Sequence, residues 1–184
     1  LNTHTQDSMT FTHPAWTANA ADFPNANLAI HNHADTTTTY IHNGYDRAEM
    51  LGIAGDFTGF GVPMALVFDD PATFSEWPMN YQDTYVDSSQ MDFTFFIGQG
   101  PMGPDSIRFK QMSQSIVDVD GWGSVTTPLG TFDALRTYTI TFNTDSIWGY
   151  FSISGWQFLQ EDVGTTYEYS WFSDDPNTMY PLVT

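Results

Sequence analysis

The stretch Thr131–Phe142, TFDALRTYTITF, alternates between two kinds of side chain. Threonine and Asp133 fill most of its odd-numbered positions, and the even-numbered ones are Phe132, Ala134, Arg136, Tyr138, Ile140 and Phe142. A period of two residues places alternate side chains on opposite faces of a β-strand. The stretch therefore predicts a long strand with one aromatic-rich face and one hydroxyl-rich face.

Turn signals on the N-terminal side extend this strand into a meander. Pro128-Leu129-Gly130 predicts a hairpin to a partner strand at Trp122–Thr127, and Asp120-Gly121 predicts a second turn, leading back to a strand over Ile107–Val119. Further strands are expected at Met91–Ile97, Ile147–Ile153, Thr165–Phe172 and Met179–Val183. We therefore predict an all-β chain, either an antiparallel β-sandwich or an open or half barrel of about 9–12 strands.

Helix is expected to be minor, because no segment of useful length repeats its apolar side chains with a 3.6-residue period. One short helical turn is expected near Pro71–Trp77. Residues 1–27 also lack a regular period and are rich in Asn, Thr, Ala and His, so we expect an extended arm ahead of a single β domain at residues 28–184.

The arm carries three widely spaced aromatic residues, Phe11, Trp16 and Phe23. Aromatic side chains on an extended segment favour docking, either on the same domain or along the sheet edge of a second copy. We expect these three residues to mediate self-association. Removing residues 1–25 should then dissolve the assembly and leave the fold intact.

The charge balance limits the partners. Four basic residues stand against 22 acidic ones, a formal net charge of −18, which disfavours nucleic acid and anionic membranes. No run of apolar residues is long enough for membrane insertion. The chain has no cysteine, which excludes disulfides, thiol catalysis and thiolate metal sites.

Motifs for catalysis are missing or uninformative. The sequence contains no Gly-x-Ser-x-Gly motif, and its glycine-rich segments at residues 52–55 and 59–61 lack the lysine of a phosphate-binding loop. A glycosidase needs two carboxylates, which any chain with this many acids could supply. We expect a protein that is not an enzyme, with a secreted hydrolase as the least favoured alternative.

Three of the five histidines, His31, His33 and His42, suggest a metal site. If Leu28–His33 and Thr39–Asn43 pair around a loop at residues 35–38, His31 lies opposite His42 and His33 is on the same face, so the three imidazoles could bind zinc, copper or nickel. A slip of one residue would abolish the site. The alternative is exposed polar strand residues.

Calcium is the other divalent cation to consider as a cofactor, since Asp118-Val119-Asp120-Gly121 resembles the start of a calcium loop. Leu129 stands where such a loop would place its bidentate Glu, however, and no helix flanks the segment. An acidic hairpin turn is the favoured interpretation.

Large aromatic residues concentrate in the last third of the chain. Trp148, Trp156 and Trp171 are candidates for stacking against a ligand such as a sugar ring. Tyr167, Tyr169 and Trp171 share one strand face, which is either a binding stripe or a core face. The core interpretation is favoured, because large rings supply most of the burial in β domains.

Three motifs carry a family resemblance: Asp120–Gly123 (DGWG), Thr127–Arg136 (TPLGTFDALR) and Tyr167–Trp171 (YEYSW). Together with Asp105–Lys110 and Gly155–Gln157, they resemble secreted Bacteroidota proteins, usually uncharacterised, that often carry a C-terminal type IX secretion sorting domain. The resemblance covers residues 81–172. It implies export to the cell surface or medium and a β fold, and supplies no catalytic residues.

Bacteroidota proteins also resemble one another in O-glycosylating Asp-Ser or Asp-Thr when certain small or apolar residues follow. Four positions match this pattern, Ser8, Thr36, Ser106 and Ser146. The resemblance therefore implies a glycoprotein modified at these hydroxyls.

Together these observations predict a non-enzymatic extracellular or cell-surface module, structural or adhesive, that builds filaments or other assemblies through its arm. The expected partners are further copies of the chain or other cell-surface molecules. The alternative is a β module that binds a glycan or another small ligand.

Overall fold

The computed structural model describes residues 9–57, 63–98, 103–128, 130–175, 178 and 181–184. Its strands are β1 (Met9–Thr12), β2 (Leu28–Asn32), β3 (Thr37–Asn43), β4 (Arg47–Gly55), β5 (Met64–Glu76), β6 (Thr84–Phe96), β7 (Ser106–Thr127), β8 (Gly130–Phe151) and β9 (Gly155–Phe172). Two short 3-10 turns, η1 (Pro14–Trp16) and η2 (Ala20–Asp22), precede β2. None of the described helical segments is long and apolar enough to span a membrane.

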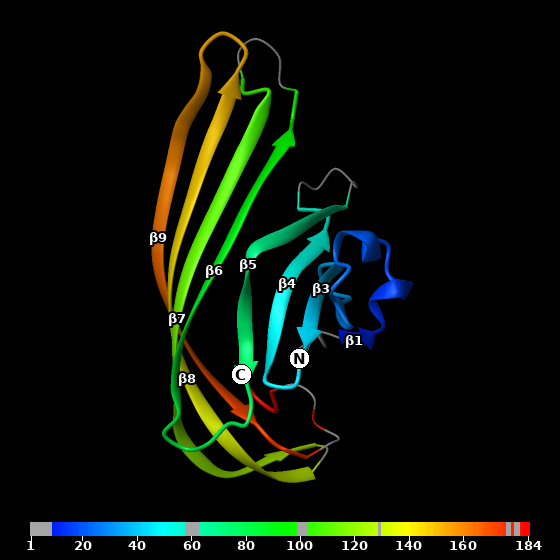
Figure 1. Ribbon diagram of the computed structural model, residues 1–184, viewed down its shortest axis with the longest axis vertical. Helices are drawn as coiled ribbons and strands as arrows, with labels where there is room; N and C mark the ends of the chain where they lie inside the picture. Colours follow the sequence, from blue (N-terminus) through cyan, green and yellow to red (C-terminus); the bar gives the residue numbers. More distant parts are fainter. Residues whose placement is uncertain (1–8, 58–62, 99–102, 129, 176–177, 179–180) are drawn as a thin grey trace, which may run out of the picture. The chain divides into compact units, whose positions relative to one another are not determined.

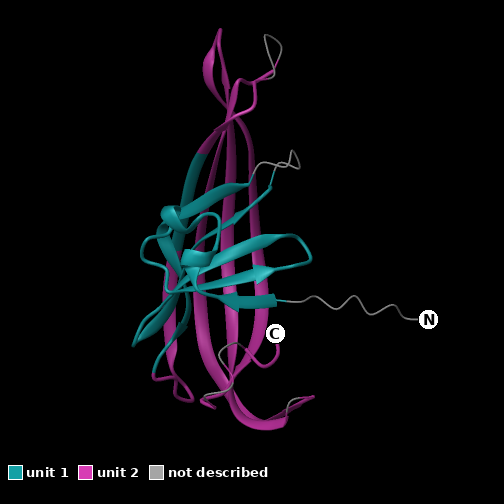
Figure 2. Ribbon diagram, turned by 90° about the vertical axis from the view of Figure 1, so that its right-hand side faces the viewer, with its two compact units in different colours: residues 1–77, 89–93 teal, residues 78–88, 94–184 magenta. Residues whose placement is uncertain are grey.

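The strands form one antiparallel sheet in chain order, from β1 to β9 (Figure 1). The structure is 70% strand and 4% helical, and the sheet is not closed on itself. The prediction of an all-β antiparallel fold is therefore confirmed. The chain divides into two compact units, residues 1–77 with 89–93 and residues 78–88 with 94–184 (Figure 2).

From Met9 onward, the arm folds into the first unit. β1 pairs antiparallel with β2, and the Thr17 hydroxyl lies 2.6 Å from the Tyr40 hydroxyl. The Phe23 ring stacks on Tyr40, with centroids 4.0 Å apart and planes 9° from parallel. Phe23 is only 2% exposed, so truncation at residue 25 would remove a core ring, contrary to our expectation that the fold would survive.

The core of the first unit depends on a glycine. Phe23, Ala29, Tyr40 and Ala54 form its buried cluster, and Gly52 pairs with Tyr40 across β3 and β4. A Cβ on Gly52 would lie 2.6 Å from Cε1 of Phe23. The missing side chain therefore makes room for the Phe23 ring against the sheet.

The helical turn expected near Pro71–Trp77 is wrong, because β5 continues to Glu76. Met50 of β4 pairs with Ala72, whereas Gly52 pairs with Val67, so the ladder is interrupted at the Asp-Asp-Pro segment. Proline has no backbone N–H and is tolerated in a strand where pairing is already broken. Asp69-Asp70-Pro71 thus marks a register irregularity within β5.

The second unit contains a long hairpin, in which β7 and β8 each span 22 residues. Its turn lies at the predicted position, since Thr127 pairs with Gly130. The turn expected at Asp120-Gly121 is wrong: β7 continues through it, and only the register shifts between Val119 and Gly121. One extra residue in one strand of an antiparallel pair is a β-bulge.

The strand expected at 147–153 is the end of β8, and the strand expected at 165–172 is the end of β9. Within the described residues, the segment expected at 179–183 contributes one bridge, Trp171 to Val183. Met179 and Tyr180 lie outside the described residues.

Candidate binding face

The strand register gathers the aromatic residues of β8 and β9 on one face of the second unit. Tyr138 pairs with Tyr169, Trp148 with Phe158 and Tyr150 with Trp156, and directly paired residues share a face. We call this surface the aromatic face. Its large rings are Phe132, Tyr138, Phe142, Trp148, Tyr150, Trp156, Phe158, Tyr167, Tyr169 and Trp171.

Much of this face is open to solvent. Every residue of β9 from Trp156 to Tyr169 is exposed, with Tyr167 at 66% and Tyr169 at 48%. The core interpretation is therefore wrong for these two tyrosines, and Trp171 alone of that stripe is half-buried. A contiguous exposed apolar surface on a folded protein commonly marks an interaction site.

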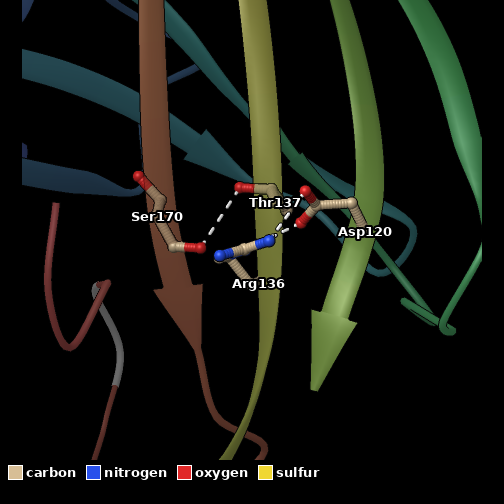
Figure 3. Close-up of polar contacts among 4 residues, drawn as sticks. All are labelled: Asp120, Arg136, Thr137 and Ser170. Carbon is tan, nitrogen blue, oxygen red and sulfur yellow. Dashed lines mark hydrogen bonds and ion pairs between the residues drawn. The ribbon is translucent and has the colours of Figure 1, made fainter. Parts of the chain in front are cut away.

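At one end of the face, the β7 bulge positions an arginine. Arg136 of β8 donates two hydrogen bonds to Asp120, Nε to Oδ1 at 2.9 Å and Nη2 to Oδ2 at 3.0 Å (Figure 3). Gly121 permits this approach, because a Cβ there would lie 3.3 Å from Nε of Arg136. Bidentate pairing fixes the plane of the guanidinium as well as its position.

The fixed guanidinium lies over two rings of β9. Its Cζ is 4.9 Å from the ring centroid of Tyr169 and 5.7 Å from that of Trp171, within cation–π range. The hydrogen bond with Asp120 raises the pKa of Arg136 above its ordinary value, so the group stays charged. We call Asp120, Arg136, Tyr138, Tyr167, Tyr169 and Trp171 the Arg136 cluster.

The next residue, Thr137, secures the strands beneath this cluster. Its side chain points to the opposite face and donates to the carbonyl oxygen of Ser170 on β9 at 3.4 Å (Figure 3). Thr137 and Ser170 are both buried. On one face of β8, Thr137 therefore holds β9 in place; on the other face, Arg136 contacts the exposed rings.

Tyr138 is the centre of a ring stack. It lies 4.7 Å from Tyr169 and 6.5 Å from Tyr167 between centroids, with nearly parallel planes in both pairs. Desolvation raises the pKa of its phenol above the ordinary value of 10.0, and the neighbouring Tyr169, Tyr167 and Asp118 add to this rise. The phenol therefore stays protonated, as a hydrogen-bond donor, beyond the usual range.

The raised pKa predicts a loss of stability in alkali. Above pH 10.0 the phenol ionises first in the unfolded chain, so the stability that Tyr138 contributes is full below that pH and falls as the pH rises. Tyr138→Phe keeps the ring and removes the titrating group. Melting temperatures measured across this range should fall less steeply for Y138F than for the natural chain, and parallel profiles would contradict this account.

A second cluster, which we call the Trp148 cluster, combines Arg108 with four aromatic residues: Trp148, Tyr150, Trp156 and Phe158. The Arg108 Cζ lies 5.7 Å from the Trp148 ring centroid. Trp148 meets Phe158 at 5.8 Å and Tyr150 meets Trp156 at 5.4 Å, both edge to face. Tyr138 and Trp148 are ten residues apart on one strand, so the two clusters are separated by about 34 Å.

The aromatic face is locally neutral. Three of the four basic residues of the chain, Arg108, Lys110 and Arg136, lie on it, and its acidic residues on β7–β9 are Asp118, Asp120 and Glu161. The opposite face of these strands carries Asp133, Asp145, Asp162 and Glu168 and no basic residue. In a chain of net charge −18, this balance makes the face distinct from its surroundings.

The three predicted stacking residues all lie on this face, but not together. Trp171 belongs to the Arg136 cluster, and Trp148 and Trp156 belong to the other. Sequence reasoning missed Arg136 and Tyr138 as site residues, although their even-numbered positions in the alternating stretch placed them on the aromatic side. The signal available was an arginine inside an otherwise apolar strand face.

The zinc site predicted from His31, His33 and His42 is wrong. His31 pairs with Thr38, not with His42, and His42 contacts the carbonyl oxygen of Asn25 through Nδ1 at 2.9 Å. His31 and His33 do lie together, with ring centroids 4.7 Å apart. The described residues contain no group of three or more His, Asp or Glu side chains suited to a metal ion.

The hairpin loop explains the different register. Asn32 accepts from the N–H of Ala34, and Asp35 accepts from the N–H and the hydroxyl of Thr37. Such side-chain hydrogen bonds stabilise turns, and Thr36 adopts the left-handed conformation with φ 58°. The loop therefore spans residues 33–36, which moves His42 beyond the end of β2.

The structure also bears on the calcium-loop interpretation of Asp118–Gly121 and on the four predicted glycosylation positions. Asp118–Gly121 lies within β7, where Asp120 binds Arg136. Thr36 is exposed in its loop, Ser106 is half-buried at the start of β7, and Ser8 lies outside the described residues. Ser146 does not fit a glycan site in the folded chain, because it is 8% exposed within a strand paired on both sides.

Of the three residues predicted to mediate self-association, two are exposed and one is buried. Phe11 is 46% exposed and Trp16 is 82% exposed. Phe23 is buried on Tyr40, so its assignment to a contact surface is wrong. Contacts through Phe11 and Trp16 stay a prediction.

Comparisons of the chain with protein-family models, with curated proteins and with solved structures found no match. The resemblance to secreted Bacteroidota proteins therefore stays a prediction. Functional conclusions rest on the residues of the aromatic face.

Proposed function

We propose that this protein is an extracellular, non-catalytic adhesive module that holds a neutral, extended polysaccharide on its aromatic face. One observation carries the proposal: large aromatic rings are exposed on a locally neutral face of a strongly acidic chain. Large aromatic residues are usually buried in the core, because they contribute the most stabilisation per residue when removed from water. Their exposure favours a ligand that covers them.

The chemistry of the two clusters suits a sugar polymer. The C–H faces of pyranose rings are flat and apolar and pack on aromatic faces, while sugar hydroxyls accept and donate hydrogen bonds. Arg136 supplies donors whose position is fixed by Asp120, and Tyr138 keeps its phenolic proton. A preorganised donor loses little conformational entropy on binding.

The spacing favours a polymer over a small ligand. The clusters lie about 34 Å apart on one continuous strand, β8. A chain that reaches both makes the second contact intramolecular, which raises the overall affinity without any new kind of contact. Single sugars should therefore bind weakly, and longer oligomers more tightly.

The charge favours a neutral ligand. A net charge of −18 repels polyanions at long range, and the cation nearest the exposed tyrosines is already neutralised by Asp120. Because both carboxylate oxygens of Asp120 accept from Arg136, this acid is committed to positioning. Its role supports adhesion instead of hydrolysis.

Affinity electrophoresis with hydroxyethyl cellulose, a soluble neutral glucan, tests the proposal. Trp156→Ala and Tyr167→Ala should each weaken binding by about 3- to 10-fold, the loss expected when one ring stack is removed. Trp122→Ala is the matched control, since Trp122 is 73% exposed but lies on the opposite face. Binding should stay nearly constant with added salt.

Two results would overturn this function. Equal losses for W122A and W156A would show that general ring exposure, not the aromatic face, is responsible. Tighter, salt-sensitive retention by the anionic polymer alginate, with none by the neutral glucan, would point to a polyanion ligand instead.

A further inference from the structure

Most of the outer edge of β9 is unpaired in the described part of the chain and forms a second candidate surface. β9 is the last strand of the sheet and follows β8 on its outer side (Figure 1). In the described part of the chain, its other side carries only the bridge between Trp171 and Val183. A long, exposed edge strand is a template for further strand pairing.

The bridge identifies which backbone groups point outward. The N–H of Trp171 donates to the carbonyl oxygen of Val183, and its carbonyl oxygen accepts from Leu182. Both groups therefore point away from β8. The register with β8 is unbroken from Gln160 to Phe172, so by period-two alternation the outward residues are Tyr169, Tyr167, Thr165, Val163 and Glu161.

We propose that this edge pairs antiparallel with the β9 edge of a second copy, about a twofold axis at Gly164. In that register, outward Glu161 exchanges hydrogen bonds with Tyr167 of the other copy, and Val163 does so with Thr165. A twofold contact closes on itself, so the product is a dimer and not a fibre.

The positions of the acids favour this register over the one centred on Thr165. With the two Gly164 residues opposite each other, Asp162 faces Thr166 of the second copy and Glu168 faces Gln160, so no carboxylates meet. With the two Thr165 residues opposite each other, Asp162 would face Glu168, and like charges directly opposite are destabilising. Gly164 also has open space where a Cβ would be, so nothing obstructs the axis.

The same acidity makes the dimer sensitive to salt. Each copy carries a net charge of −18, and exposed charges repel over about 10 Å at moderate ionic strength. The attractive part, backbone hydrogen bonding, changes little with salt. Association should therefore strengthen as salt is added, opposite to the behaviour of a contact held by ion pairs.

Sedimentation velocity of the full chain at low and high salt tests the dimer, with charge variants at the residue that faces Asp162. Thr166→Asp should weaken association about fivefold and Thr166→Lys should strengthen it by a similar factor, since the symmetry places two such pairs in each dimer. Thr166 pairs with Thr141 on the face opposite the rings, so neither variant should alter glucan binding.

Thr165→Pro removes one outward N–H and none of those that bond to β8, so it should abolish the dimer, whereas Thr165→Ala should not. Hydrogen exchange should show protection of the amides of Glu161, Val163, Thr165 and Tyr167 on association. A natural chain that stays monomeric at high salt and high concentration would overturn the proposal. So would a shift of the same sign for T166D and T166K.

Discussion

Replacing Phe23 with alanine is expected to lower the free energy of unfolding by about 3–5 kcal/mol, the range for a buried Phe truncated to Ala. Phe23 is 2% exposed and stacks face to face on Tyr40, which is 1% exposed. The cavity would open between the arm and the sheet, where backbone hydrogen bonds of η2 and β3 limit collapse. Urea denaturation followed by tryptophan fluorescence measures the loss.

Phe11→Ala is the matched control for this prediction. Phe11 is an aromatic residue of the same arm but is 46% exposed, so its truncation should cost well under half as much. If the two variants were equally stable, the arm would not be part of the core. Phe23 would then return to the set of candidate contact residues.

Gly52→Ala should have an effect of similar size, about 3–5 kcal/mol, because overpacking and backbone strain add. The new Cβ would lie 2.2 Å from the carbonyl oxygen of Leu66 and 3.0 Å from Cα of Val67. Both are backbone atoms, which cannot rotate away as a side chain can. The φ of Gly52, +154°, is also one that other residues rarely adopt.

Gly164→Ala is the control for this substitution. Gly164 also lies within a strand, yet a Cβ there would meet nothing within 4 Å. Alanine at this position should leave the free energy of unfolding nearly unchanged, as is usual for exposed sites. Thermal unfolding of the two variants side by side would separate steric conflict at Gly52 from the general cost of losing a glycine.

Local alternation was a sufficient basis for predicting the long strands. The TFDALRTYTITF stretch lies in β8 with its even-numbered side chains on one face, as expected, because no bulge interrupts β8 itself. The errors came at Asp120-Gly121, where a turn was expected, and near Pro71–Trp77, where a helical turn was expected. Instead, β7 continues through Asp120 and β5 continues to Glu76. A bulge uses the same residues as a turn, and only the long-range partner, Arg136 for Asp120, decides between them.

Exposure was harder to predict than strand position. Tyr167, Tyr169 and Trp171 were correctly placed on one face, but sequence alone does not show whether anything covers that face. β9 is the last strand of the sheet, so in the described part of the chain the only paired neighbour of its rings beyond β8 is Val183, at Trp171. The histidine site failed for a related reason, since hairpin register depends on loop hydrogen bonds such as those of Asp35.

The aromatic face and the β9 edge give this chain two separable surfaces. In the proposed function, sugar rings stack on side chains of the Arg136 cluster and the Trp148 cluster, all on one face, whereas strand pairing uses the backbone of the β9 edge. A dimer joined at β9 would continue the aromatic face from one copy into the next, because sheet faces are continuous across a paired edge.

The most direct test of the central claim is an NMR titration of the full chain with cellohexaose, a soluble neutral oligosaccharide, read at the ring resonances of assigned tryptophans and tyrosines. Trp156, Tyr167 and Tyr169 should shift, while Trp16, Trp122 and Tyr45 should not, although these three are more exposed than Trp156. Shifts confined to the second set, or equal shifts in both, would contradict a binding role for the aromatic face.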